Sequence, residues 1–389
     1  MYDAKNFFTY IDSRNDRCKL AQRGHSKEKR SDLRIVGLAL VVTRAFKIPI
    51  LHQVYEGNVH DSAQFPSICS DLAERFKQLS KKCQELTLVF DKGNNSQEGL
   101  LLAQMEHVHF VGSLTPTEHP ALLDIPLKKF QPVSEERWPG VRACRTRCEA
   151  MGQERECVVT FSEHFFSQQL HGWVTQLTKA TLQLEALNKD ISKEKKNRRT
   201  RKSVEQRVNE ILTPLHFREA ITVDIIDHDG GRFSLKYKTD MVAFNKFAVH
   251  RGGKTILFTD RDKWSTEAII ADYRGQSEIE GVFRLMKADD YLHWQPMFHW
   301  TDSKIQVHAF YCVLALLLVA VMTKRLHDSG LDLPPEQILN AVADMEETAL
   351  FYPERDGKQL TRTTYTKLKP KQKRISEILG LDGWRVARG

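Results

Sequence analysis

The chain has 389 residues, of which 41% are hydrophobic and 28% charged, a composition typical of a soluble globular protein but a length that excludes a single compact core. Its 58 Lys and Arg outnumber 50 Asp and Glu, which gives a formal net charge of +8. This excess favours an anionic partner such as nucleic acid, and a merely basic protein is the open alternative.

Seven cysteines are scattered along the chain, and their odd number and irregular spacing imply no disulfide framework. We therefore expect reduced thiols, as in a cytoplasmic protein. Cys144, Cys148 and Cys157 are close in sequence, but no CxxC pair or histidine partner completes a zinc site with them. The first residues lack the pattern of a signal peptide.

Residues 1–114 predict five strands and two helices in the order β-β-β-α-β-α-β. We expect the strands near residues 2–11, 35–43, 48–55, 86–90 and 108–114. The helices are expected over 65–80 and, opened by an N-cap in the loop at 93–96, to about 105. Short connections make the first three strands an antiparallel meander, and the last strands are expected to run parallel to the first.

Residues 115–253 are predicted to form an inserted domain, because prolines punctuate an irregular stretch at its start. Strands are expected at residues 158–161 and 232–237, with a long polar helical segment over 173–212 between them. That segment carries a basic run at 193–202, which either forms a solvated helix face or binds phosphate.

Residues 254–326 return to a strand at 255–258, followed by helices over 266–287 and 305–326, and residues 327–389 form a helical, basic end. The most apolar run, residues 309–322, is shorter than the ~18 residues that a membrane span needs. We therefore expect a helix buried in the core and no membrane contact.

Two acidic residues near the expected sheet are candidate metal ligands. Mg²⁺ prefers oxygen ligands, and two-metal phosphoryl transfer requires carboxylates that converge on the ions. Asp91 ends an apolar strand and is expected at the sheet edge where α/β proteins form their sites, with a turn-forming role as the alternative. Asp3 would face the same site if its strand paired centrally and ran parallel to the strand before Asp91. Otherwise Asp3 is a frayed terminal residue.

A third acid, Glu280, lies on the helix expected over residues 266–287. One stripe of this helix is apolar and is expected to pack on the core. The other stripe joins Glu280 at helical spacing to Tyr273, Gln276, Arg284 and Lys287. A carboxylate followed by cations suits a metal ligand beside a phosphate contact. The alternative is an ordinary ion pair between Glu280 and Arg284, worth roughly 0.2–0.5 kcal/mol.

Five segments carry a family resemblance: YDAKNFFTYI, LAQRGHSKEKRSDLRIVGLAL, YEGNVHDS, LTLVFDKGNNS and YRGQSEIEGVFRLMK. Together they resemble the DDE transposases of bacterial insertion sequences, and among these the IS-four group, in the branch with long inserted domains. The helix signature of this group is Tyr-x2-Arg-x3-Glu-x6-Lys. Here it reads Tyr273, Gln276, Glu280, Lys287, with every spacing kept and Gln276 in place of the signature Arg.

The resemblance implies an α/β fold, with an RNase H-like mixed five-stranded sheet and flanking helices. Residues 1–114 and 254–326 would form this catalytic domain, and the insertion domain at 115–253 would interrupt it. The implied ligands of two Mg²⁺ ions, for which Mn²⁺ is expected to substitute, are Asp3, Asp91 and Glu280. Contacts to DNA are expected from Lys92, Tyr273, Arg274, Gln276, Arg284 and Lys287. Glu278 is a less favoured ligand, because it lies off the Glu280 stripe.

The function implied by the resemblance is hydrolysis of phosphodiester bonds at transposon ends, followed by strand transfer. The partners would be double-stranded DNA and a second copy of the chain in a synaptic complex, at the nucleoid of the bacterial cytoplasm. Because Met1 lies so close to Asp3, we expect the N-terminal DNA-binding region of the group to be absent. Two alternatives stay open: an impaired remnant that only binds DNA, and an RNase H-like nuclease without strand transfer.

Other segments have weaker expected roles on this reading. The basic stretches at residues 23–34, 193–202 and 367–374 are candidates to line the path of the DNA. Trp294 and Trp300 are expected to pack in the core or on the surface, and stacking on bases is the alternative.

Overall fold

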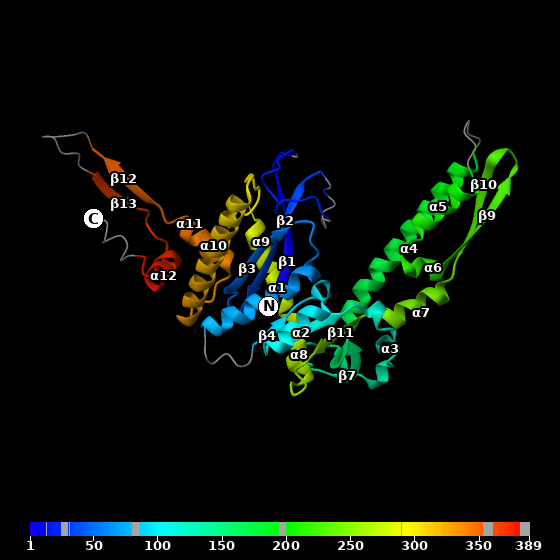
Figure 1. Cartoon of the computed structure of the whole chain (residues 1–389), viewed down its shortest axis with the longest axis horizontal. Coiled ribbons are helices and arrows are strands. Elements are labelled where there is room, and N and C mark those ends of the chain that lie inside the picture. The colour runs from blue at the N-terminus through cyan, green and yellow to red at the C-terminus, as the bar shows by residue number, and fades with distance from the viewer. Residues whose placement is uncertain are drawn as a thin grey trace. The chain divides into compact units, whose positions relative to one another are not determined.

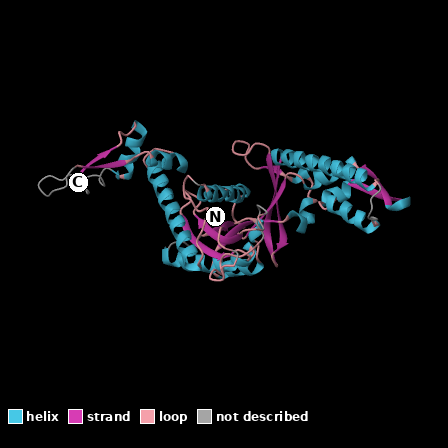
Figure 2. Cartoon of the chain, turned by 90° about the horizontal axis from the view of Figure 1, so that it is seen from above, coloured by secondary structure: helices cyan, strands magenta, loops and turns pink. Residues whose placement is uncertain are grey.

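The computed structural model describes the chain apart from residues 13, 25–29, 31, 80–85, 194–199, 289, 353–360 and 382–389. Its contacts divide it into two compact units: unit 1 is Met1–Gly112 with Ala271–Gly389, and unit 2 is Ser113–Ile270. The sequence predicted domain boundaries after residues 114 and 253. The first lies close to the change of unit after Gly112, and the second lies inside unit 2. Both units contain helices and strands, which confirms the mixed α/β class (Figures 1 and 2).

Unit 1 opens with an antiparallel three-stranded sheet, which confirms the meander expected from the short connections. Its strands are β1 (Tyr2–Thr9), β2 (Arg34–Val42) and β3 (Pro49–Glu56). β2 is buried along almost its whole length, which explains why its apolar sequence does not alternate. Gly37 of β2 pairs with Tyr55, and a Cβ at Gly37 would lie 2.3 Å from the Tyr55 ring. Glycine is therefore required for this ring to lie against the strand.

A parallel strand pair follows in unit 1, with helices before and between its strands. These elements are α1 (Asp61–Leu79), β4 (Thr87–Val89), η1 (Lys92–Asn94), α2 (Gln97–Met105) and β5 (His109–Leu114). Ser96, in the loop expected to hold the N-cap, caps α2, since its side chain accepts a hydrogen bond from the Gly99 amide at 3.2 Å. The Phe90 ring, directly before Asp91, is fully buried and lies 4.7 Å from Phe65 of α1.

The single five-stranded sheet implied by the resemblance needs correction. In the described part of the chain, the strands form a three-stranded sheet, a six-stranded mixed sheet that includes β4 and β5, and two hairpins. β1 pairs with β2 alone among the described ladders, and it has no ladder with β4. β4 has only three residues, too few for a long ladder, and all three pair with β5.

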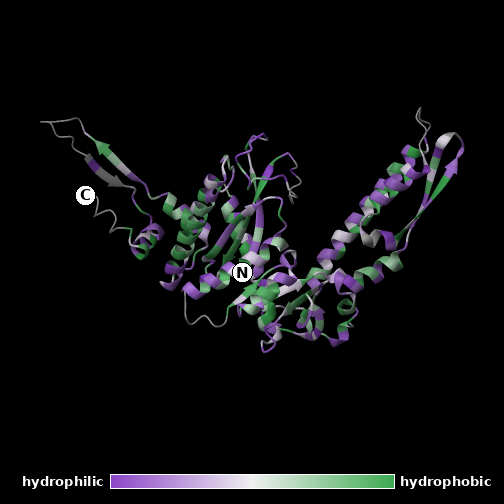
Figure 3. Ribbon diagram, viewed as in Figure 1, coloured by the Kyte–Doolittle hydropathy of each residue, from purple (hydrophilic) through white to green (hydrophobic). Residues whose placement is uncertain are grey.

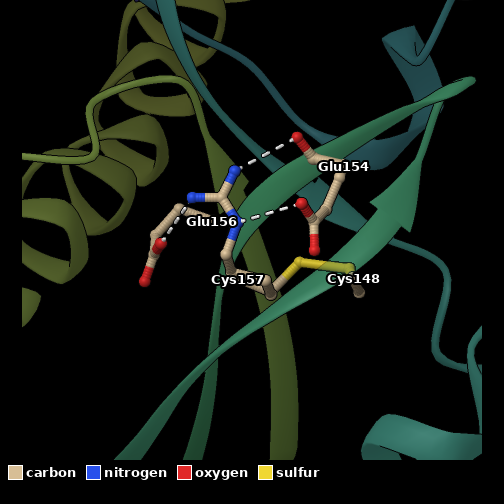
Figure 4. The surroundings of a disulfide bond; sticks show 5 residues. Cys148, Glu154, Glu156 and Cys157 are labelled. Carbon is tan, nitrogen blue, oxygen red and sulfur yellow. Dashed lines mark hydrogen bonds and ion pairs between the residues drawn. A yellow bond between two sulfur atoms is a disulfide. The ribbon is translucent and has the colours of Figure 1, made fainter.

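The β-rich part of unit 2 is an antiparallel array. Its elements are η2 (Pro116–Glu118), α3 (Pro120–Leu123), η3 (Leu127–Lys129), β6 (Gln131–Pro132), β7 (Val141–Ala150), β8 (Gln153–Ser162) and β11 (Lys254–Thr259). The β7–β8 hairpin brings Cys148 and Cys157 into a disulfide beside Glu154 and Glu156 (Figure 4). The expectation of reduced thiols is wrong for this pair. The pairing of β7 with β8 brings the two sulfur atoms together, and the spacing of the cysteines in the sequence does not show this pairing. Since both sulfurs are bonded, neither cysteine is available to a zinc site with Cys144.

The rest of unit 2 has its own apolar core, which includes Leu184, Ile191, Val208, Phe233 and Phe244. Its elements are α4 (Glu163–Ile191), α5 (Arg201–Ile211), α6 (Leu215–Ala220), β9 (Ile221–His228), η4 (Asp229–Gly231), β10 (Arg232–Thr239) and α7 (Met241–Arg251). The strand expected at 232–237 is confirmed as β10. The long segment expected over 173–212 corresponds to α4 and α5, and most of its basic run lies outside the described residues.

The C-terminal part of unit 1 is built on one long helix. Its elements are α10 (Asp302–Asp328), α11 (Pro335–Ala343), β12 (Glu347–Phe351), β13 (Thr361–Tyr365) and α12 (Pro370–Leu379). Leu326, Ile338 and Ile375 join the three helices in a small core. By length and composition alone, α10 could cross a membrane. Of its most apolar window, 39% is buried inside the protein. The expected core helix is therefore buried on one face alone, and Figure 3 shows hydrophobic residues along it.

Candidate active site around Asp91, Tyr273 and Glu280

The helix expected over residues 266–287 is interrupted, which separates the first signature residue from the other three. It consists of α8 (Thr266–Arg274) and α9 (Gln276–Lys287), with Gly275 between them. The Gly275 amide is shared by the carbonyls of Ala271 at 3.3 Å and Asp272 at 3.1 Å. Glycine has a low helix propensity, so interrupting the helix at this position costs little free energy. Tyr273 is thus carried by α8, and Glu280 by α9.

Asp91 and Tyr273 meet although 182 positions separate them in the sequence. The Tyr273 hydroxyl donates to Asp91 Oδ1 at 3.1 Å. Asp91 lies half-buried after β4, and its carbonyl accepts the Asn94 amide at 2.9 Å at the start of η1. An ion pair between Arg44 and the neighbouring Asp272 holds the same end of α8. The spacing signature and the strand-ending acid therefore belong to one place in unit 1.

α9 lies along β1, the strand that carries Asp3. The Gln276 side chain, which is buried, donates from Nε2 to the Tyr2 carbonyl at 2.6 Å. At the other end of α9, the Lys287 ammonium lies 5.4 Å from the centroid of the Phe7 ring. Glu280 stands between these two contacts on the same helical stripe. α9 is therefore held against β1 on either side of Glu280.

The position of Gln276 corrects one expected DNA contact. Gln276 was expected to contact phosphate in place of the signature Arg, but only 8% of its surface is exposed and its amide is used to hold β1. Its Oε1 is buried without a hydrogen-bond partner. A side chain with so little exposed surface links α9 to β1 and has little to offer a phosphate.

Glu280 and Arg284 are exposed, and the described part of the chain gives neither side chain a hydrogen-bond or ion-pair partner. The ordinary ion pair between them, the alternative reading of the sequence, is therefore not formed. Glu278, two residues before Glu280, is paired with Lys47 instead. This pairing agrees with the lower expectation for Glu278 as a ligand.

Asp3 is half-buried on β1 opposite Leu40 and is engaged locally. Its Oδ2 lies 3.2 Å from Lys5 Nζ, and its Oδ1 accepts the Ala4 amide at 2.9 Å. Asp3 is thus an ordered strand residue, which rules out the alternative of a frayed terminus. The parallel pairing of its strand with β4, on which a shared sheet edge depended, is not among the described ladders.

A hydrogen bond between the buried Tyr55 and the half-buried Asp61 was not predicted from the sequence. The Tyr55 hydroxyl donates to Asp61 Oδ1 at 2.7 Å. Burial, and then the nearby Asp61 and Asp3 carboxylates, raise the pKa of the Tyr2 hydroxyl, and the same acids act on Tyr55. Both hydroxyls therefore stay protonated near Asp3. The segment YEGNVHDS held the signal, but its spacing does not show that the Tyr55 and Asp61 side chains meet.

The carboxylates present suit a divalent cation by chemistry but not by their arrangement. Carboxylate oxygens are the ligands that Mg²⁺ prefers. Among the residues that the structure describes, however, no group of three or more His, Cys, Asp or Glu side chains is placed to hold a metal ion. Asp3 is engaged with Lys5, and Asp91 with Tyr273. The expected three-ligand site is therefore not assembled in this conformation.

Three of the four cations expected to contact DNA are exposed, and the fourth, Lys287, is half-buried. Lys92 follows Asp91, Arg274 follows Tyr273, and Arg284 stands one turn after Glu280, all exposed.

Trp294 is fully buried against Phe7, which confirms packing as its role. Trp300 is 48% exposed with the Arg17 and Lys304 side chains over its ring. Half of the basic stretch at 23–34 lies outside the described residues.

Comparisons with known proteins add little to this geometry. No family model and no curated protein matches the chain. It is structurally similar to a solved piggyBac transposase in a synaptic complex with hairpin DNA, at 8% sequence identity and a TM-score of 0.39. The match covers 88% of this chain and 51% of that one, so this chain spans about half the length of the solved chain. A TM-score of this size does not establish a common fold, and it assigns no function.

Proposed function

We propose that this chain is the catalytic part of a DNA transposase of the IS-four type, which cuts DNA at transposon ends and joins the ends to target DNA. The observation that carries the proposal is the hydrogen bond from Tyr273 to Asp91, at 3.1 Å. It links Tyr273, the first residue of the helix signature, to Asp91. Asp91 was a candidate ligand on separate grounds, because it ends an apolar strand. The seating of α9 on β1 supports the inclusion of Asp3 and Glu280 in the same region.

The cofactor that this proposal implies is a divalent cation, Mg²⁺ with Mn²⁺ as a substitute, which Asp3, Asp91 and Glu280 would hold. The described conformation does not gather the three acids. Binding of the cation would require Asp3 to exchange its ion pair with Lys5 for the metal. Titration of the protein with Mn²⁺, read by its electron paramagnetic resonance signal, measures such binding without any DNA. Asp91→Asn and Glu280→Gln are expected to weaken it.

The direct test of the proposal is a joining assay. Labelled DNA fragments that carry the inverted repeats flanking the coding sequence are incubated with the protein, a plasmid and Mg²⁺. Labelled ends covalently joined to the plasmid support a transposase. Cleaved but unjoined ends would indicate a nuclease without strand transfer.

A second candidate function, DNA binding without cleavage, is favoured by one observation: the acids form no metal-holding group in the part of the chain that is described. In that case DNA affinity would be retained in the absence of divalent cations, and no product would form in the joining assay under any metal. Asp91→Ala would then leave the measured function, which is binding, unchanged.

Arg284→Gln is expected to weaken DNA binding and to lower the salt dependence of the affinity. Arg284 is exposed beside Glu280 and has no ion-pair partner among the described residues, so its charge is available to a phosphate. Each lost phosphate contact lowers the slope of log affinity against log salt by about 1. Fluorescence anisotropy with a labelled duplex at several salt concentrations measures this slope. Lys77→Gln is the matched control, because Lys77 is paired with Glu106 at 2.6 Å. Equal slopes for all three proteins would place Arg284 outside the DNA contact.

Tyr273→Phe is expected to reduce cleavage about tenfold or more with little change in DNA affinity. The substitution removes only the hydroxyl that donates to Asp91, and a hydrogen bond to a charged group contributes about 1.5–3 kcal/mol. Single-turnover cleavage rates and anisotropy titrations separate the two effects. The opposite result, a loss of affinity with an unchanged rate, would make Tyr273 a DNA contact and not a residue that positions Asp91.

A further inference from the structure

The hairpin of β12 and β13, named here the arm, exposes an apolar strand. Every residue of β12 is exposed, and its described ladder is with β13 alone. Leu350 is 43% exposed, Phe351 68% and Tyr352 44%. Figure 3 shows β12 as a largely hydrophobic strand at one end of the chain. A two-stranded hairpin is marginally stable in water. The arm therefore needs a partner surface.

The outer face of α10 is a second unpartnered apolar surface. Its residues, named here the α10 stripe, are exposed by 37–63%: Val307, Phe310, Tyr311, Leu314 and Leu318. The steps from Val307 to Tyr311, Leu314 and Leu318 are four, three and four residues, so these side chains share one face of the helix. The opposite face of α10 is buried, through residues such as Ala309 and Leu316. A contiguous exposed apolar stripe of this kind marks an interaction site.

The two surfaces match in length. Eleven residues separate Val307 from Leu318, which corresponds to about 17 Å along a helix. The five residues of β12 span about 14 Å, and the exposed Tyr352 directly after them extends the segment to about 17 Å. β12 together with Tyr352 can therefore cover the α10 stripe from end to end.

The two surfaces also match in charge. Arg325 continues the stripe on the same face, is exposed, and has no ion-pair partner among the described residues. The arm begins with Glu346 and Glu347, which are exposed and equally without an ion pair in the described part of the chain. The neighbouring Lys324, by contrast, is already paired with Asp328. At the start of β12 the unpaired charges are thus acidic, and the charge that continues the stripe is basic, although β13 also carries the exposed Arg362.

We propose that two copies of this chain associate by exchanging arms, with β12 of each copy packed on the α10 stripe of the other. In a two-fold symmetric dimer the same contact forms twice, so both unpartnered surfaces of both copies are covered. A dimer is expected of a transposase, but this interface rests on the arm and the stripe and not on the proposed function. It requires neither DNA nor metal.

The test is a charge-swap complementation measured by sedimentation equilibrium without DNA. The wild-type chain is expected to have twice the monomer mass. Leu318→Arg alone and Phe351→Glu alone are each expected to give monomers, because each places a charge in both copies of the contact. An equimolar mixture of the two variants is expected to restore the dimer. One of its two contacts is then wild type, and the other pairs the introduced Arg with the introduced Glu.

Several outcomes would overturn the arm exchange. A wild-type monomer would exclude it. If Phe351→Glu alone stays dimeric, the stripe pairs with itself and not with the arm. If the mixture stays monomeric, arm and stripe are not partners. Binding of the wild type to lipid vesicles as a monomer, lost in Leu318→Arg, would make the stripe a membrane contact.

Val242→Arg, at an 80% exposed apolar position of α7, is the control that is expected to leave the mass unchanged. Because no DNA is present, these results do not bear on cleavage.

Discussion

Asp91→Asn is expected to reduce DNA cleavage by more than about 100-fold while the protein stays folded. Asparagine keeps an oxygen that accepts the Tyr273 hydroxyl, so the observed hydrogen bond can persist and only the negative charge is removed. Loss of residues that merely orient metal ligands costs about 10- to 100-fold, and loss of a ligand itself is expected to cost more. The measurement is the initial rate of nicking of an end-labelled fragment in Mg²⁺, with circular dichroism to verify the fold.

The same loss is expected for Glu280→Gln, and the chain offers a matched control for it. Glu278→Gln changes the same side chain on the same helix, but at a position where the carboxylate is paired with Lys47. Cleavage by Glu278→Gln is expected to stay within a few-fold of wild type. Undiminished cleavage by Glu280→Gln would remove Glu280 from the site. Equal losses in both variants would indicate damage to α9 and not the loss of a ligand.

Features set by neighbouring residues were predicted well from the sequence. The β1–β2–β3 meander follows from short connections, and the cap at Ser96 follows from one side chain and the amide three residues later. The signature spacing placed Glu280 and Lys287 on one helical stripe, as observed. In each case the determining interactions are local, so the pattern of residue types contains them.

Features set by distant contacts were predicted less well. Helical periodicity did not show the break at Gly275, and it placed Gln276 on an exposed stripe although a contact with the Tyr2 carbonyl buries it. The apolar run in α10 indicated burial, but composition does not show which face of a helix finds a partner. Whether Asp3 and Asp91 share a sheet edge depends on long-range strand pairing, which no local pattern contains.

The packing of β1 against α9 links stability to the candidate site, and Phe7→Ala is expected to disrupt it. Phe7 is fully buried, with its ring 4.5 Å from Trp294 and 6.2 Å from Phe283 of α9. Replacement of a buried phenylalanine by alanine costs about 3–5 kcal/mol, through lost burial and the cavity left behind. Amide hydrogen exchange in β1 and α9 is therefore expected to accelerate by about 100-fold or more.

Tyr10→Ala is the matched control for Phe7→Ala, because Tyr10 is an aromatic residue directly after β1 that is 47% exposed. Its removal is expected to change stability by no more than about 0.5 kcal/mol and to leave exchange in α9 unaltered. Since α9 carries Glu280, Phe7→Ala is also expected to lower cleavage although Phe7 is far too buried to touch DNA. Slow, wild-type exchange in α9 of the Phe7→Ala protein would show that α9 holds its place without the Phe7 packing, and β1 would then not be what positions the helix that carries Glu280.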